Sequence, residues 1–215
     1  MIPKTIQQKL DEGRSYRAVA QIEVRAAGDE EERKIVEGYA TTFNDPYVLW
    51  QEGGYTVMEQ IDARAFDKTD MADVIMQYDH EGRVFARTSN GTLMLTPDDH
   101  GLHIRADLGG TEIGRQLYEE IKGGYTDKMS FGFVVDEDKR EITENHDTGE
   151  TTILRTITAI RKLYDVSAVS LPANNATEIS ARAYGEGVIA EAAEERRAHA
   201  EREARKRKIK ILMEV

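Results

Sequence analysis

The sequence contains no cysteine among its 215 residues. Disulfide bonds, cysteine nucleophiles and cysteine-ligated zinc sites are therefore excluded, and the composition fits a reducing compartment. No run of about 18 apolar residues exists, the length that a membrane-spanning helix needs. Residues 1–14 also lack the apolar stretch of a secretory signal peptide. We therefore expect no membrane partner.

Basic side chains are the minority among the charged residues. The chain has 29 lysines and arginines against 40 aspartates and glutamates, which gives a formal net charge of -11. This balance argues against a general nucleic-acid-binding surface and favours a soluble, self-repelling particle. The glycines at 109, 110 and 114 lack the spacing of a phosphate-binding loop, and no Lys-Ser/Thr pair follows them. We expect no cofactor and no metal.

The apolar pattern predicts a mainly β protein with one core. Alternation of apolar and polar residues has the period of a strand with one buried face. The segment 16–43 is predicted to be a hairpin, 44–55 is an irregular loop that holds Trp50, and two helices follow residues suited to capping, Asp62 and Thr111. The predicted strands are 16–26, 34–43, 57–61, 74–80, 83–88, 92–96, 101–108, 129–135 and 151–171; the predicted helices are 63–68 and 112–122.

The composition changes near residue 186. From there to Val215 the chain is rich in alanine, glutamate and arginine and contains no proline, which favours a long solvated helix with many charge pairs one turn apart. Its sparse apolar face makes it an extension, a partner helix or a removable segment rather than core. We therefore divide the chain into a flexible segment (1–15), one domain (16–183) and a charged helical extension (184–215).

The stretch Met-Ser-Phe-Gly-Phe at 129–133 opens a buried strand after a Gly-Gly-Tyr turn. Ser130 is either a satisfied core hydroxyl or a positioned nucleophile. A serine nucleophile needs a base, and the base needs a third group that fixes its tautomer. His80 ends an apolar strand and could be that base, and Asp165 opens another apolar strand and could orient it. Asp79 is a poor alternative to Asp165, because neighbours on a strand point to opposite faces.

Five segments, in order, resemble the tailed-phage prohead proteases, capsid-maturation serine proteases related in fold to the herpesvirus assemblins. The resemblance covers roughly residues 16–183. One segment departs from the family pattern, since Ala63-Arg64 stands where Pro-Gly is usual. The matching segments are Gly38–Asn44, Glu59–Phe66, Tyr78–Glu81, Lys128–Phe133 and Leu163–Asn174.

The resemblance implies a small, mainly antiparallel β-barrel with flanking helices, with Ser130 as nucleophile, His80 as general base and acid, and Asp165 as the orienting carboxylate. Family members vary at this acidic position. By analogy with the assemblins, we expect the turn Pro172-Ala173-Asn174 either to present backbone N–H groups to the oxyanion site or to hold a water there. Gly132 would let the substrate backbone approach the serine.

The resemblance also implies a biological setting. The chain would be an endopeptidase inside the viral procapsid in the host cytoplasm. Its substrates would be scaffold segments, the extension of the major capsid protein and the protease itself, and it would self-associate. The alternative is a non-catalytic, scaffold-binding structural head protein that keeps the same fold.

Overall fold

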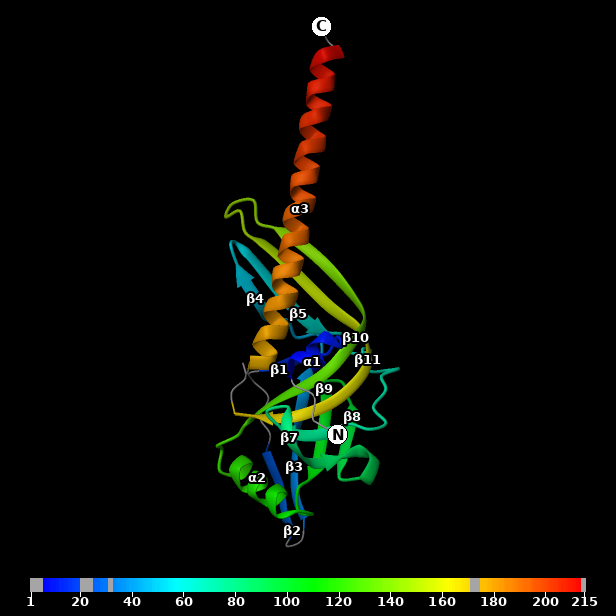
Figure 1. Cartoon of the computed structure of the whole chain (residues 1–215), viewed down its shortest axis with the longest axis vertical. Coiled ribbons are helices and arrows are strands. Elements are labelled where there is room, and N and C mark those ends of the chain that lie inside the picture. Colours follow the sequence, from blue (N-terminus) through cyan, green and yellow to red (C-terminus); the bar gives the residue numbers. More distant parts are fainter. Residues whose placement is uncertain (1–5, 20–24, 31–32, 171–174, 214–215) are drawn as a thin grey trace.

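The computed structural model describes residues 6–19, 25–30, 33–170 and 175–213. Strands predominate, and three helices accompany them in these ranges (Figure 1). In chain order the elements are α1 (Ile6–Asp11), β1 (Ser15–Val19), β2 (Arg25–Glu30), β3 (Arg33–Thr42), β4 (Tyr47–Glu52), β5 (Tyr55–Ile61), β6 (Ile75–Tyr78), β7 (Glu81–Arg87), the 3-10 turn η1 (Thr88–Asn90), β8 (Leu93–Pro97), β9 (Gly101–Asp107), α2 (Glu112–Lys122), β10 (Lys128–Glu144), β11 (Thr151–Val169) and α3 (Asn175–Met213).

The long hairpin of β10 and β11 is the centre of the larger, seven-stranded sheet. The strands pair antiparallel from Lys128↔Val169 to Glu144↔Thr151. β1 pairs with the other edge of β10, while β5 and β6 lie along β11 at opposite ends. Alternating side chains of this hairpin, such as Phe131 and Val166, enter the main core, which explains why the chain continues as strand here.

A second, four-stranded antiparallel sheet has the order β2-β3-β9-β8. Several of its buried residues, among them Val36 and Ile104, belong to the same core as those of β10 and β11. Helix α2 contributes Leu117 and Ile121 to this core. As predicted, Thr111 caps the helix by accepting a hydrogen bond from the backbone of Gly114. One core therefore joins both sheets and α2.

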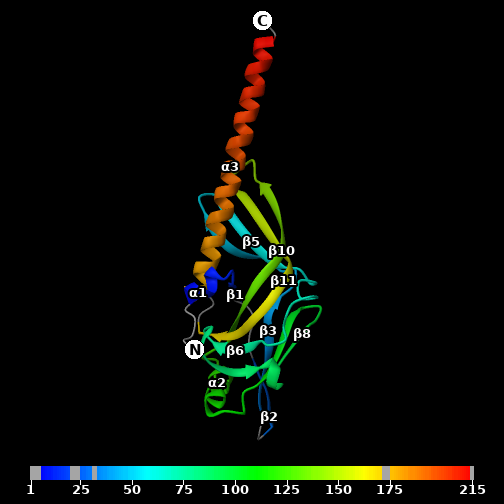
Figure 2. The same ribbon diagram turned by 45° about the vertical axis from the view of Figure 1, so that its right-hand side comes forward.

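Helix α3 spans 39 residues and extends well beyond the sheets (Figures 1 and 2). Its first half packs on the body, where Val188 and Ala192 are buried with Val57 of β5 and Ile153 of β11. Trp50 lies at the edge of this second cluster. The boundary expected at 183/184 falls inside this continuous helix. Among the described residues, no helix is long and apolar enough to cross a membrane.

Several local predictions were wrong. The stretch predicted as an irregular loop contains a strand, β4, because Tyr47–Glu52 pairs with β5. Residues 63–68 form turns rather than a helix, and the carboxylate of Asp62 accepts a hydrogen bond from the backbone of Arg64 within them. The predicted hairpin 16–43 is split: β2 pairs with β3, but β1 pairs with β10.

The predicted barrel is not confirmed. The pairings of the described strands give two separate sheets, and neither closes on itself. The larger sheet is also mixed rather than antiparallel throughout, since β5 and β6 both run parallel to β11.

Candidate active site

Three strands bring Ser130, His80 and Asp165 together. In the β10–β11 ladder Ser130 lies opposite Ser167, and Gly132 lies opposite Asp165. Strand β6 runs parallel to this end of β11 and finishes at Tyr78, so the turn that follows carries His80 over the ladder.

The three side chains form one continuous chain of contacts. His80 Nε2 lies 2.5 Å from Ser130 Oγ, and His80 Nδ1 is in hydrogen-bond contact with Asp165 Oδ1. All three residues are buried. A histidine held in this way can take the serine proton at one nitrogen while the carboxylate stabilises the resulting imidazolium at the other.

The turn that positions His80 has left-handed backbone at two non-glycine residues. Asp79 has φ 47° and His80 has φ 61°. Each such residue costs on the order of 1–3 kcal/mol and persists only where its surroundings hold it. Here the Asp79 N–H donates to the Ala168 carbonyl at 3.0 Å, and the Asp79 carboxylate accepts from the Ser170 N–H and hydroxyl at 3.1 and 3.0 Å. Asp79 therefore anchors the turn instead of supporting the imidazole.

The carboxylate of Asp165 is stabilised in its charged form. Burial alone raises the pKa of this carboxyl group, but the charge and hydrogen bond of His80 and the hydrogen bond of Ser167 outweigh burial and lower the pKa below 3.8. The Ser167 hydroxyl donates to Asp165 Oδ1 at 2.9 Å. Asp165 therefore remains ionised at neutral pH.

Gly132 leaves the space that the Asp165 carboxylate needs. A Cβ atom at Gly132 would collide with Asp165 Oδ2 and would lie 2.7 Å from Cε1 of Tyr16. The close contact with Asp165 is by itself a reason for glycine at position 132. The approach of a substrate backbone to Gly132 stays a prediction. The expected oxyanion residues Pro172, Ala173 and Asn174 lie outside the described residues.

The N-terminal elements cover the site. The Ser130 hydroxyl can donate to the Arg17 carbonyl at 2.9 Å, and the ring of Tyr16 meets the His80 ring edge-on at a centroid distance of 4.5 Å. The ammonium group of Lys9, on α1, donates to the His80 carbonyl at 2.9 Å. One hydroxyl hydrogen thus has two possible acceptors, His80 Nε2 and the Arg17 carbonyl.

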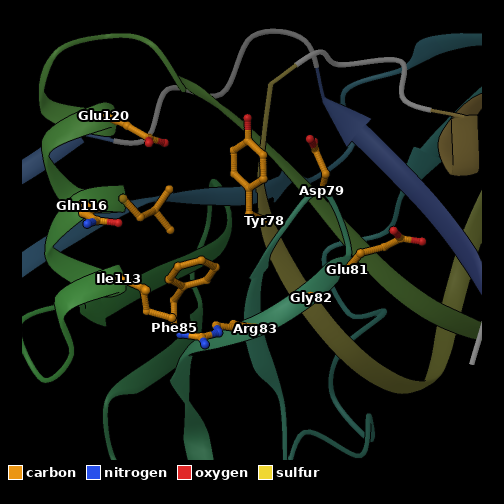
Figure 3. Close-up of a pocket in the computed structure, with 10 residues that line it drawn as sticks. Tyr78, Asp79, Glu81, Gly82, Arg83, Phe85, Ile113, Gln116 and Glu120 are labelled. Carbon is orange, nitrogen blue, oxygen red and sulfur yellow. The ribbon is translucent and has the colours of Figure 1, made fainter. Parts of the chain in front are cut away.

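A surface pocket of about 620 Å³ adjoins the turn that carries His80. Figure 3 shows Phe85 beside Ile113, between β7 and α2, with Tyr78 and Asp79 on the other side of the hollow. Its rim also includes Glu81. Ser130, His80 and Asp165 do not line this pocket, so it is a neighbour of the site rather than its interior.

Comparison with protein families gives a match over most of the chain. The caudovirus prohead serine protease family matches residues 20–188. The chain belongs to this family. Family membership supports a serine protease role in phage maturation, as the resemblance of its motifs implied. Searches of curated proteins and of solved structures found no match.

Sequence reasoning selected the three side chains that meet, but it missed those that enclose them. Ser167 belongs to the matching segment Leu163–Asn174, but no role was predicted for its hydroxyl. Alternation predicts that Tyr16 and Arg17 lie on a strand of the hairpin with 34–43, and it does not indicate their position beside Ser130. No local signal shows that the strand pairs with β10, because alternation identifies a strand but not its neighbour.

Proposed function

We propose that this protein is a serine endopeptidase of phage procapsid maturation, with Ser130 as nucleophile, His80 as general base and acid, and Asp165 as the group that orients the imidazole. The observation that carries the proposal is the buried chain of contacts from Ser130 Oγ through His80 to Asp165. Family membership supplies the reaction class.

In this mechanism His80 removes the proton of Ser130 as the hydroxyl oxygen adds to a peptide carbonyl. His80 then gives the proton to the departing amine, and an acyl-enzyme remains on Ser130. Water, activated by the same imidazole, hydrolyses the ester. Asp165 stays ionised throughout and stabilises the imidazolium. The backbone of 172–174 is our candidate for the oxyanion donors.

The proposed substrates are scaffold segments and the extension of the major capsid protein, cut inside the procapsid, and the protease itself. An extended peptide would bind by adding a strand to a sheet edge, a common mode of peptide recognition. Self-association of the protease within the confined interior is part of the proposal.

The direct test is expression with the cognate capsid protein, followed by mass spectrometry of both chains. Ser130→Ala should abolish fragments that the wild type produces, and His80→Ala should reduce turnover by several orders of magnitude. Ser89→Ala is the matched control, because this serine is exposed in η1, away from the site. Identical fragments from wild type and Ser130→Ala would reject peptidase activity.

The alternative is a structural head protein that binds scaffold without cutting it. The complete burial of Ser130 and His80 is the observation that favours it, since a substrate cannot reach them in this conformation. On this hypothesis Ser130→Ala leaves capsid maturation unchanged.

A further inference from the structure

Strand β1 lies where an added peptide strand would have to bind to meet Ser130. It pairs antiparallel with the edge of β10, and Ala18 lies directly opposite Ser130 in the ladder. The matched family region begins at residue 20, so β1 and α1 lie outside it, whereas Ser130, His80 and Asp165 lie within it. The edge beside the nucleophile is therefore occupied by a segment that the family region does not include.

The backbone of β1 presents one particular peptide bond to the nucleophile. The Ser130 hydroxyl is 2.9 Å from the carbonyl oxygen of Arg17, the carbonyl of the Arg17–Ala18 bond. The hydroxyl hydrogen-bonds the oxygen of this carbonyl group, so the Arg17–Ala18 bond is the peptide bond of β1 that lies beside the nucleophile. Arg17 therefore stands in the position of the residue that precedes a cut bond.

The side chain of Arg17 enters a buried acidic site. Its guanidinium donates from Nε to Glu59 Oε1 at 2.5 Å and from the Nη2 atom to Glu59 Oε2 at 3.1 Å. Glu59 is fully buried and also contacts the Tyr47 hydroxyl at 2.6 Å and the Arg155 guanidinium at 2.9 Å. Two-pronged contact of this kind suits the planar guanidinium better than any other side chain.

The residues that receive Arg17 all belong to the body of the protein. Tyr47 is on β4, Glu59 on β5 and Arg155 on β11, and all three lie within the matched family region. Without β1, Glu59 would keep Arg155 and Tyr47 as partners. The acidic site is thus built by the body, and β1 supplies only the arginine that fills it.

We propose that β1 is a substrate-like segment bound in the peptide site of the protease, with the Arg17–Ala18 bond at Ser130 and Glu59 as the residue that selects arginine before the cut bond. This inference rests on the proposed peptidase function and adds to it a self-cleavage position and a substrate preference.

The cleavage step is balanced with groups that the chain holds. Ser130 Oγ adds to the Arg17 carbonyl carbon and gives its proton to His80. The bond between the Arg17 carbonyl carbon and the Ala18 nitrogen then breaks, and His80 returns the proton to the new amine. Water hydrolyses the Arg17 ester, which frees residues 1–17 with a terminal carboxylate and leaves Ala18 as the new N-terminus. The part of the β10 edge that pairs with Ser15, Tyr16 and Arg17 is then open to other chains.

The first test follows the N-terminus of the purified full-length chain by mass spectrometry. The wild type should yield a fragment that ends at Arg17 and a chain that begins at Ala18, and Ser130→Ala should yield neither. Arg17→Gln should slow this cut by about 100-fold, because the buried carboxylate loses one of its two guanidinium partners, and Arg17→Lys should be cut at an intermediate rate. Ser89→Ala should be cut at the wild-type rate.

A second measurement does not require the Arg17→Gln variant to fold, because it uses synthetic peptides as substrates. Two synthetic peptides of residues 12–22, one with arginine and one with glutamine at position 17, are added to the wild-type protein. The arginine peptide should be cut after position 17 about 100-fold faster, and Glu59→Gln should bring the two rates together. Equal rates with the wild type would reject Glu59 as the selecting residue.

The outcomes separate this inference from the function on which it rests. Ser130-dependent cleavage of the capsid protein by a chain that keeps residues 1–17 would overturn the inference and leave the peptidase intact. Absence of all Ser130-dependent cleavage, of the capsid protein as well as of the peptides, would overturn both.

Discussion

The carboxylate of Asp165 lies against the backbone of Gly132, its partner across the β10–β11 ladder, in space that a side chain would fill. This contact links the proposed orienting carboxylate to the stretch Met-Ser-Phe-Gly-Phe, because the glycine two residues after Ser130 makes the position of Asp165 possible.

Gly132→Ala should therefore reduce activity although all three proposed catalytic side chains are kept. The new methyl group would displace Asp165 and the ring of Tyr16, and a displacement of about 1 Å at a catalytic group can cost about 100-fold. We expect a loss of that order in kcat/KM on a capsid-protein substrate. Gly110→Ala is the control, because a Cβ there meets nothing within 4 Å. Wild-type kinetics of Gly132→Ala would contradict this role.

Ser167→Ala removes a hydroxyl that donates to Asp165 Oδ1. Hydrogen bonds to charged groups contribute about 1.5–3 kcal/mol, so we expect the free energy of unfolding to fall by about 2 kcal/mol. The pKa of Asp165 should also rise toward its ordinary value, because one group that stabilises the carboxylate is lost. Denaturant unfolding gives the first quantity and NMR titration of the carboxyl group gives the second. An unchanged Asp165 pKa would show that the hydroxyl does not stabilise the charge.

The sequence predicted the three central residues because their chemistry leaves local traces: a hydroxyl and a carboxylate within apolar strands, and a histidine at a strand end. Helix α2 was also predictable, since the cap at Thr111 and the apolar spacing after it are local. The neighbours of each strand were not, because pairing depends on the whole fold. β1 alternates as a hairpin strand would, yet it pairs with β10, more than a hundred residues away.

The same reason explains why the sequence did not predict the contacts of helix α3. Its sparse apolar face predicted a solvated extension, but Val188 and Ala192 are buried in the small cluster with Val57 and Ile153. Whether a short apolar stripe on a charged helix is buried cannot be predicted until the apolar patch that it covers on the sheet is known. The strand at Tyr47–Glu52 was missed in a similar way, because Asp45-Pro46 and Gly53-Gly54 bracket it with turn signals.

Glu59 gives the fold a dependence on acid. Burial raises the pKa of this carboxyl group, but the charges and hydrogen bonds of Arg17 and Arg155 outweigh burial, so the pKa in the folded state lies below 4.5. A lowered pKa stabilises the folded state above about pH 4.5, and this contribution is lost as pH falls through the folded-state value.

Glu59→Gln should therefore lower the free energy of unfolding most at neutral pH, by about 3–5 kcal/mol, because the buried Arg17 guanidinium loses the carboxylate that it contacts, while Arg155 keeps Asp138 as a charged partner. The difference from wild type should shrink as the pH falls below about 4.5. Urea unfolding between pH 3 and 7 measures this, with the exposed Glu112→Gln of α2 as control. A difference that stayed constant with pH would show that the ionised carboxylate does not stabilise the fold.

Helix α3 offers the last prediction, because its two halves should respond differently to the same kind of truncation. Val188 is buried against Val57 and Ile153, so Val188→Ala should lower the free energy of unfolding by about 2 kcal/mol through lost burial and a residual cavity. Ile209 lies near the far end of the helix and is 49% exposed. Ile209→Ala should therefore change the free energy of unfolding by no more than about 0.5 kcal/mol. Thermal and denaturant unfolding of the two variants compare the halves directly. Equal destabilisation would mean that the distal half also packs on the body, and a neutral Val188→Ala would mean that the cluster beneath α3 does not anchor the helix.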